Sequence, residues 1–224
     1  RSISERALAL ERGFENLAGH IDILRKFNLP FIVAVNYFPS DTNTEIKMIE
    51  DYCREFGVEC AIVEVFNQGG KGALDLASKV LTAAENSKLT DLLPLYPANL
   101  GIEEKIEVIA KGIYGAGSIY IESVARKKMK KFSELGFNSL PICIAKTPSS
   151  FSDNPKWFGA PKGWTLTITD MRLSAGARFI VVIAGNILLM PGLSKNPRAV
   201  KMDVDESGNI VMDSRQIFSY SKTR

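Results

Sequence analysis

Two loops of this 224-residue chain carry aromatic residues at positions suited to binding a flat ring. Phe38 follows the apolar run 31–35, and Phe66 ends the run 61–66, which is apolar except for Glu64. If the two runs are neighbouring parallel strands, both rings lie at the same edge of the sheet. Facing rings there can clamp a flat heteroaromatic ligand by offset stacking, although packing in or beside the core is the commoner role of such aromatics.

The second loop continues into the glycine-rich sequence Gly69-Gly70-Lys71-Gly72. A predicted helix follows it, so the backbone N–H groups of the loop and the helix N-terminus can hold an anion. It is not a Walker loop, because the spacing G-x-x-x-x-G-K-[ST] is absent from the chain. A tight turn that requires positive φ angles explains the same glycines without a ligand, and both interpretations stay open.

The hydrophobic pattern indicates the elements that position these loops. Apolar residues at helical spacing predict a helix over residues 8–27. The run 31–35 is continuous and β-branched, which predicts a strand buried on both faces. A second helix begins with a capping box formed by Thr42 and Glu45 and precedes the strand 61–66. This alternation predicts an α/β fold with a layered parallel sheet, and both strand-to-helix loops lie at its carboxyl edge.

A second region begins after the Pro- and Gly-containing segment 86–101. We therefore predict an α/β domain over residues 1–95, which carries the two loops, and a smaller α+β domain over residues 96–224. The smaller domain is expected to hold helices near 103–113 and 123–135 and strands near 141–146, 164–169 and 179–190. Between the last two strands, residues 169–177 form a predicted loop of small residues that lets a ligand approach the backbone.

Composition and charge exclude several classes of protein. With 46% hydrophobic and 24% charged residues the chain is neither disordered nor fibrous, and its net charge of +3 does not indicate a nucleic-acid-binding protein. The basic run 126–131 is interpreted as the solvent face of an amphipathic helix. The apolar run 179–184 is too short to span a membrane.

The single histidine and the three cysteines also restrict the chemistry. His20 has no second histidine or cysteine at ligand spacing, so no metal site is expected. An odd number of cysteines without a C-x-x-C pair disfavours a secreted disulfide framework, and we expect a cytoplasmic protein. The chain opens at Arg1 without a Met, which is expected for a piece of a longer protein.

Six blocks of sequence, in order from about residue 5 to about residue 211, resemble the C-terminal portion of formate–tetrahydrofolate ligase, also called formyltetrahydrofolate synthetase. The blocks are Asn16-Leu17 with His20-Ile21, residues 33–42, Glu64-Val65-Phe66 with Gly69-Gly70-Lys71-Gly72, residues 140–147, residues 174–177 and Met190-Pro191-Gly192-Leu193. The resemblance implies ATP-dependent joining of formate to tetrahydrofolate through formyl phosphate, giving 10-formyltetrahydrofolate. Tetrahydrofolate and ATP with Mg²⁺ would then be substrates, with no permanently bound cofactor.

The resemblance also implies roles for particular residues. Substrate-binding roles fall on the sandwiching rings Phe38 and Phe66 and on the neighbouring Pro39 and Asp41. Nucleotide-binding roles fall on Gly69, Gly70, Lys71, Ser174, Ala175 and Gly176. Phe66 stands where the family usually has Trp, so weaker stacking is expected, by about 1 kcal/mol. Arg178 stands where a glycine is expected, and the tail 212–224 does not match the usual ending.

The phosphate-binding Gly-Lys-Thr loop of that family belongs to its N-terminal portion and is absent from this chain. We therefore expect the isolated chain to lack ligase activity and to need the missing N-terminal portion as its partner. The resemblance also implies a homo-oligomer. The alternatives are a stand-alone folate-binding or regulatory module, and an α/β interaction protein whose glycines and aromatics are structural.

Overall fold

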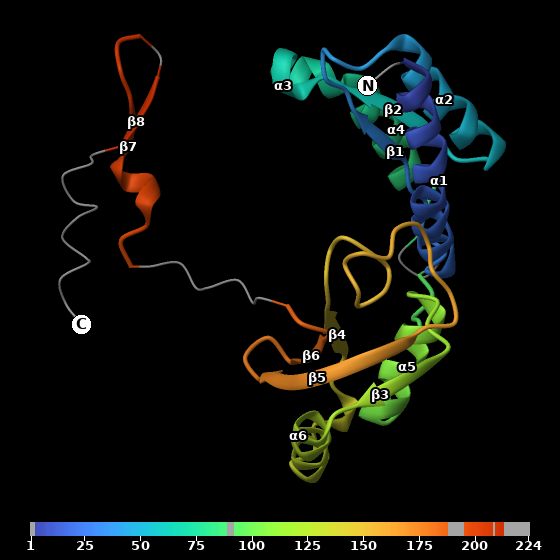
Figure 1. Cartoon of the computed structure of the whole chain (residues 1–224), viewed down its shortest axis with the longest axis vertical. Helices are drawn as coiled ribbons and strands as arrows, with labels where there is room; N and C mark the ends of the chain where they lie inside the picture. The colour runs from blue at the N-terminus through green and yellow to red at the C-terminus, as the bar shows by residue number, and fades with distance from the viewer. Residues whose placement is uncertain (1–2, 89–91, 188–194, 208, 213–224) are drawn as a thin grey trace. The chain divides into compact units, whose positions relative to one another are not determined.

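The computed structural model describes residues 3–88, 92–187, 195–207 and 209–212 (Figure 1). The contacts divide the chain into one compact unit over residues 1–187 and another over residues 188–224, and each is described by itself. The boundary predicted between residues 95 and 96 lies inside the first unit and stays a prediction.

The first unit begins with a helix-rich region around a two-stranded parallel sheet (Figure 1). Its elements are α1 (Ile3–Lys26), β1 (Val33–Asn36), α2 (Asn43–Glu55), β2 (Cys60–Val63), α3 (Val65–Gln68), the 3₁₀ helix η1 (Gly69–Ala73) and α4 (Leu74–Glu85). The predicted capping box is present, because Glu45 N donates to Thr42 Oγ1 and Thr42 N donates to Glu45 Oε2 at 2.9 Å. The parallel pairing of β1 with β2 confirms the predicted α/β class.

Two details of this region differ from the prediction. The strand predicted over residues 61–66 ends at Val63, because Glu64 begins a helical turn instead of continuing the pairing. The predicted burial of β1 on both faces is wrong. Val33 and Val35 are half-buried, whereas Ala34 and Asn36 are exposed, because the sheet has only two strands among the described residues.

The rest of the first unit is built on a four-stranded sheet with the order β3-β5-β6-β4. Its elements are α5 (Ile102–Gly112), β3 (Ser118–Ile121), α6 (Ser123–Glu134), the 3₁₀ helix η3 (Phe137–Ser139), β4 (Ile142–Ala145), β5 (Thr165–Ser174) and β6 (Phe179–Ala184). β3 pairs parallel with β5, β4 pairs parallel with β6, and β5 pairs antiparallel with β6. The sheet is therefore mixed, as expected for an α+β region.

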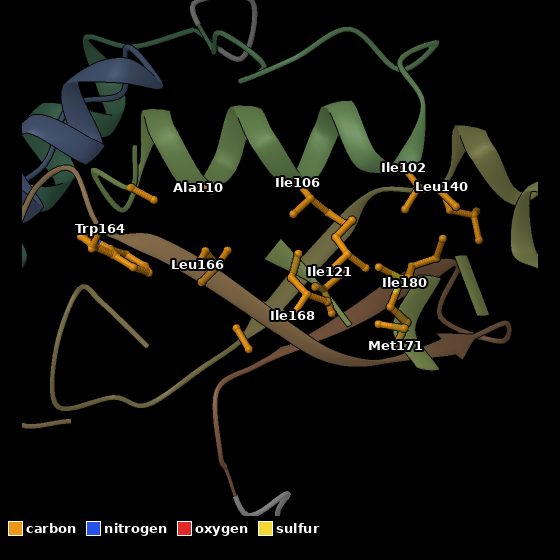
Figure 2. Close-up of a cluster of buried hydrophobic side chains, with 14 residues drawn as sticks. Ile102, Ile106, Ala110, Ile121, Leu140, Trp164, Leu166, Ile168, Met171 and Ile180 are labelled. Atoms are coloured by element: carbon orange, nitrogen blue, oxygen red, sulfur yellow. The ribbon is translucent and has the colours of Figure 1, made fainter. Parts of the chain in front are cut away.

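The main core lies between α5 and this sheet. Figure 2 shows Ile102, Ile106 and Ala110 of α5 on the side of the helix that faces the sheet, where Leu166, Ile168 and Ile180 lie. Their spacing of four residues places these three side chains on one face of α5. Their burial removes apolar surface from water and fixes α5 on the sheet.

One fully buried side chain in this region is charged. The Lys105 ammonium group donates to the carbonyl oxygens of Asn138 at 2.6 Å and Leu140 at 3.2 Å, and it lies 5.8 Å from the centre of the Tyr96 ring. Burial lowers the pKa of Lys105. The buried amine therefore satisfies two carbonyl groups just before β4 instead of lining a site.

Three predictions for this region need correction. β3 was not predicted, because a four-residue strand between a glycine-containing turn and α6 has too little periodicity to detect. The loop predicted over residues 169–177 is strand up to Ser174, because β5 passes a bulge between Ile168 and Asp170 and continues pairing with β6. β6 ends at Ala184, and residues 188–190 of the predicted strand lie outside the described residues.

The basic run on α6 forms ion pairs. Arg126 pairs with Glu103 at 3.5 Å, Lys128 with Asp170 at 2.5 Å and Lys130 with Glu134 at 3.8 Å. Met129 and Phe132 pack against the core from the same helix, which supports the amphipathic interpretation.

In the second unit, the described elements are η4 (Arg198–Lys201), β7 (Met202–Val204) and β8 (Ile210–Met212), and the two strands form an antiparallel hairpin. No described helix is both long and apolar enough to cross a membrane.

Candidate functional site

Phe38 lies in a tight turn that begins after β1. The backbone N–H of Asp41 donates to the carbonyl of Phe38 at 2.8 Å, and Asp41 Oδ2 accepts from the N–H of Phe38 at 2.9 Å. Pro39 stiffens the turn, because its ring fixes its own φ and restricts the residue before it. The Phe38 side chain is 48% exposed, so the turn holds an aromatic ring at the surface.

Phe66 lies on α3, in a closed loop that follows β2. Both Asn67 and Gln68 donate their N–H groups to the carbonyl of Glu64, and the N–H of Glu64 donates to the carbonyl of Gly72 at 2.9 Å. This last hydrogen bond joins the two ends of the loop, Glu64 and Gly72. The Phe66 ring is 83% exposed, so this loop holds a second aromatic ring at the surface.

The strand register places both rings at the carboxyl edge of one sheet. Asn36 pairs with Val63 at the end of the ladder, and the N–H of Tyr37 still donates to the carbonyl of Val63 at 3.0 Å. Phe38 follows the first strand and Phe66 follows the second, so both come after the carboxyl ends of these parallel strands. This is the edge at which open α/β sheets bind ligands.

Gly69, Gly70 and Lys71 lie on η1 beside Phe66, and all three are exposed. Gly69 has a φ of +57°, so the turn interpretation explains this glycine. Gly72 has a different reason for lacking a side chain, because its Cα lies against the backbone of Glu64. Gly70 has neither constraint, since a Cβ there would meet no atom within 4 Å.

Ser174, Ala175 and Gly176 lie elsewhere, at the hairpin between β5 and β6 of the four-stranded sheet. Ser174 pairs with Phe179, and the N–H of Arg178 donates to the carbonyl of Ala175 at 3.2 Å. Arg178 has a φ of +59°, a conformation that favours glycine and that accounts for the glycine expected at this position. The predicted nucleotide-binding residues thus fall on two different sheets, and their shared role stays a prediction.

The polar loop after β4 has a structural explanation. The Lys146 ammonium group donates to the carbonyls of Thr147, Ser150 and Ser152 and lies 4.8 Å from the centre of the Tyr114 ring. Burial lowers the pKa of Lys146. The Asp153 carboxylate accepts from the N–H of Thr167 at 2.9 Å. These polar groups bond to one another and to the sheet, so they shape the loop itself.

A groove of about 360 Å³ lies at the opposite, amino end of β1 and β2, between Phe31, Val58 and the C-terminal half of α4. Of the two cations that line it, Arg25 donates to the carbonyl of Phe56, and Lys79 donates to the carbonyl of Cys60 at 2.7 Å and pairs with Asp75 at 2.8 Å. Lys79 is already used to hold α4 to β2. Among the described residues no group of three or more His, Cys, Asp or Glu side chains is arranged to hold a metal ion.

Comparison with known protein families identifies the fold family. The family model described as formate–tetrahydrofolate ligase matches residues 2–212, which includes both aromatic loops and the β5–β6 hairpin. The chain belongs to the formate–tetrahydrofolate ligase family.

Curated members of this family are similar over nearly the whole chain. The chain is 47% identical over 202 residues to the formate–tetrahydrofolate ligase of Petrotoga mobilis, 46% over 203 residues to that of Thermotoga maritima and 47% over 208 residues to that of Thermosipho africanus. These alignments cover 90%, 91% and 93% of this chain but only 36%, 37% and 37% of the relatives. The chain therefore spans little more than a third of the length of these formate–tetrahydrofolate ligases.

One contributor to the site was missed by the sequence analysis. Arg6 of α1 donates its Nη2 group to the carbonyl of Ser40 at 3.1 Å and its Nε group to Glu45 at 2.8 Å. It therefore contacts the turn that carries Phe38. No local signal marks this residue, because an arginine on the polar face of a helix is ordinarily a solvated side chain.

Proposed function

We propose that this chain is the tetrahydrofolate-binding part of a formate–tetrahydrofolate ligase, which uses ATP to join formate to tetrahydrofolate through formyl phosphate. The product is 10-formyltetrahydrofolate. The observation that carries the proposal is the pair of exposed rings, Phe38 and Phe66, at the carboxyl edge of one parallel sheet. Membership of the ligase family supports the choice of a pterin as the ring that they hold.

The two rings and their supports have separate roles in this proposal. Phe38 and Phe66 stack on opposite faces of the pterin ring, because offset stacking favours aromatic rings over other flat groups. Pro39 and Asp41 form the wall of the turn beside it, and Asp41 holds the N–H of Phe38 in place. The chain itself thus supplies binding and orientation of the folate.

The nucleotide is placed by a second group of residues in the proposal. Gly69, Gly70 and Lys71 present exposed backbone and an ammonium group beside Phe66, although the N–H of Gly69 itself donates to the carbonyl of Val65. Ser174, Ala175 and Gly176 supply a second wall from the β5–β6 hairpin. ATP would enter with Mg²⁺ as a substrate, no cofactor is permanently bound, and the phosphates are held by the phosphate-binding loop of the rest of the ligase.

The partner in this proposal is the N-terminal portion of the ligase. Little more than a third of the length of the curated relatives is matched. The apolar strand β1 has exposed positions, and α4 exposes Leu74, Val80 and Leu81. Apolar strands of parallel sheets are normally covered on both faces, so a covering layer from the rest of the ligase fits this surface. The assembled enzyme is proposed to be a cytoplasmic homo-oligomer.

Calorimetric titration with tetrahydrofolate under anaerobic conditions tests the folate site. We expect wild type to bind, and Phe38→Ala and Phe66→Ala each to raise Kd about tenfold, since one lost stacking partner costs about 1 kcal/mol or more. Phe158→Ala is the matched control, because this ring is 80% exposed but lies in the loop between β4 and β5. Absence of binding by wild type, or unchanged binding in both site variants, would remove the proposal.

Turnover by the isolated chain tests whether catalysis requires the N-terminal portion. We expect no ATP-dependent formation of 10-formyltetrahydrofolate above background without the N-terminal portion. Robust turnover by the chain alone would show that the phosphates are held by residues within it. Binding without turnover, even after the N-terminal portion is added, would instead favour the stand-alone folate-binding module.

A further inference from the structure

The turn that carries Phe38 is held from one side by a residue far away in the sequence. Arg6 of α1 donates its Nη2 group to the carbonyl of Ser40 at 3.1 Å, and the same nitrogen lies 3.9 Å from Asp41 Oδ1. Ser40 and Asp41 are the last two residues of the turn. The guanidinium group therefore contacts both the backbone and the side chain that close it.

The same guanidinium group is anchored on α2. Its Nε group donates to Glu45 Oε1 at 2.8 Å, while Glu45 Oε2 accepts from the N–H and the hydroxyl of Thr42 at 2.9 and 2.8 Å. The bonds from the backbone of Thr42, from its hydroxyl and from Arg6 lower the pKa of Glu45. Glu45 thus stays ionised at neutral pH and gives Arg6 a fixed partner at the start of the helix.

These contacts form one continuous set. The Arg6 side chain is about one-third exposed, and those of Asp41 and Glu45 are less so, which makes these contacts more persistent than those of an open surface pair. Only a planar guanidinium group donates in two directions at once to the turn and to the helix. The two carboxylates would also repel each other if the cation between them were removed.

We propose that Arg6 is a positioning residue for substrate binding, which sets the direction of the Phe38 ring through the contacts of its guanidinium group with Ser40, Asp41 and Glu45. The functional part of this inference rests on the proposed folate site. Arg6 does not touch the ligand. It determines how the ring that does so is presented.

Amide hydrogen exchange tests the positioning itself, without any ligand. We expect Arg6→Met, which removes the charge and the donors but keeps much of the side-chain length, to accelerate exchange at Phe38 and Asp41 about tenfold, on the scale of one lost charged hydrogen bond. Exchange in the core of α5, at Ile106, should stay unchanged. Arg54→Met is the matched control, because Arg54 forms an Arg–Asp pair with Asp51 at 2.7 Å on the exposed side of α2. Unchanged exchange at Phe38 and Asp41 would overturn the proposal.

Tetrahydrofolate titration tests the consequence for binding. We expect Arg6→Met to raise Kd about tenfold and Arg6→Lys to raise it less, because lysine keeps the charge but cannot bridge both partners. In a Phe38→Ala background the effect of Arg6→Met should almost vanish, since Arg6 acts through that ring. An equal loss in both backgrounds would mean that Arg6 stabilises the chain generally.

The two proposals fail in different ways. If Phe38→Ala leaves folate binding unchanged, the folate site is wrong, and the exchange data still decide whether Arg6 holds the turn. If Phe38→Ala weakens binding and Arg6→Met does not, the folate site stands and the positioning role is wrong. Arg6→Lys provides the milder substitution should Arg6→Met fail to fold.

Discussion

The backbones of Gly72 and Glu64 lie very close together at the two ends of the loop that carries Phe66. A Cβ added to Gly72 would lie 2.5 Å from the carbonyl carbon of Glu64 and 2.6 Å from its oxygen. The same two residues are joined by the hydrogen bond from Glu64 N to Gly72 O, at 2.9 Å. The exposed ring of Phe66 therefore depends on a contact that tolerates no side chain.

The first prediction concerns this contact. We expect Gly72→Ala to lower the free energy of unfolding by about 2 kcal/mol, because a methyl group there must push backbone against backbone. Chemical denaturation followed by circular dichroism measures the change. Gly70→Ala is the control for stability, since its Cβ would meet no atom within 4 Å. Equal stability of the two variants would mean that the backbones of Gly72 and Glu64 can move apart at little cost.

The second prediction concerns the size of the stacking ring. We expect Phe66→Trp to lower the Kd for tetrahydrofolate about fivefold, because the indole offers a larger face and the 83% exposed position has room for it. Phe158→Trp controls for the general effect of an added exposed indole. Unchanged or weaker binding in Phe66→Trp would show that this ring does not stack on the ligand.

The sequence was sufficient to predict the two strands and the helix α2 beside the rings, because their signals are local, but α3, which carries Phe66, was predicted as strand. The capping box of Thr42 and Glu45 fixes the start of α2, and Asn28 and Gly57 adopt the positive φ angles that end the helices before them. The short strand β3 and the extension of β5 past residue 169 were missed, because they depend on pairing with distant strands. Such pairing leaves no periodic pattern in four residues.

The burial of β1 and the role of Arg6 could not be predicted for a related reason. The apolar run 31–35 indicates a strand covered on both faces, yet which surface covers it depends on residues outside the pattern itself. Arg6 contacts Ser40, which lies on another element far along the chain. The sequence pattern indicates that the run 31–35 needs a covering layer, but the residues that cover a strand or contact a turn are known only from the tertiary structure.

The third prediction concerns the hairpin between β5 and β6. Arg178 is in the left-handed conformation at a φ of +59°, where a Cβ is crowded by the backbone. We expect Arg178→Gly to raise the free energy of unfolding by about 1 kcal/mol, which denaturant titration measures. Arg178→Ala is the control, because it removes the charge but keeps the Cβ and should give no such gain. A gain of equal size in both variants would assign the effect to charge.

The fourth prediction concerns thiol reactivity. Cys143 is exposed on β4, whereas Cys53 is buried and hydrogen-bonded to the half-buried Cys60. Burial raises the pKa of Cys53, and burial together with the neighbouring Cys53 raises that of Cys60 to about 12. Because the thiolate is the reactive form, we expect iodoacetamide at pH 8 to label Cys143 quickly and the other two only after unfolding. Peptide mass spectrometry identifies the labelled residue, and rapid labelling of Cys60 would contradict the structure.

The last prediction is the effect of the Cys60 thiol on stability at high pH. In the folded state the Cys60 thiol keeps its proton up to about pH 12, whereas a cysteine in the unfolded chain loses its proton at about pH 8.5. Deprotonation therefore favours the unfolded chain, so this contribution to stability is complete below about pH 8.5 and is lost as pH rises toward 12. Burial also raises the pKa of the half-buried Tyr52 and Tyr114, so the measurement is the difference between variants. We expect Cys60→Ala to lose less stability than wild type between pH 8 and pH 11 in denaturant titrations, and Cys143→Ala to follow wild type. Parallel curves for Cys60→Ala and wild type would show that this thiol titrates alike in both states.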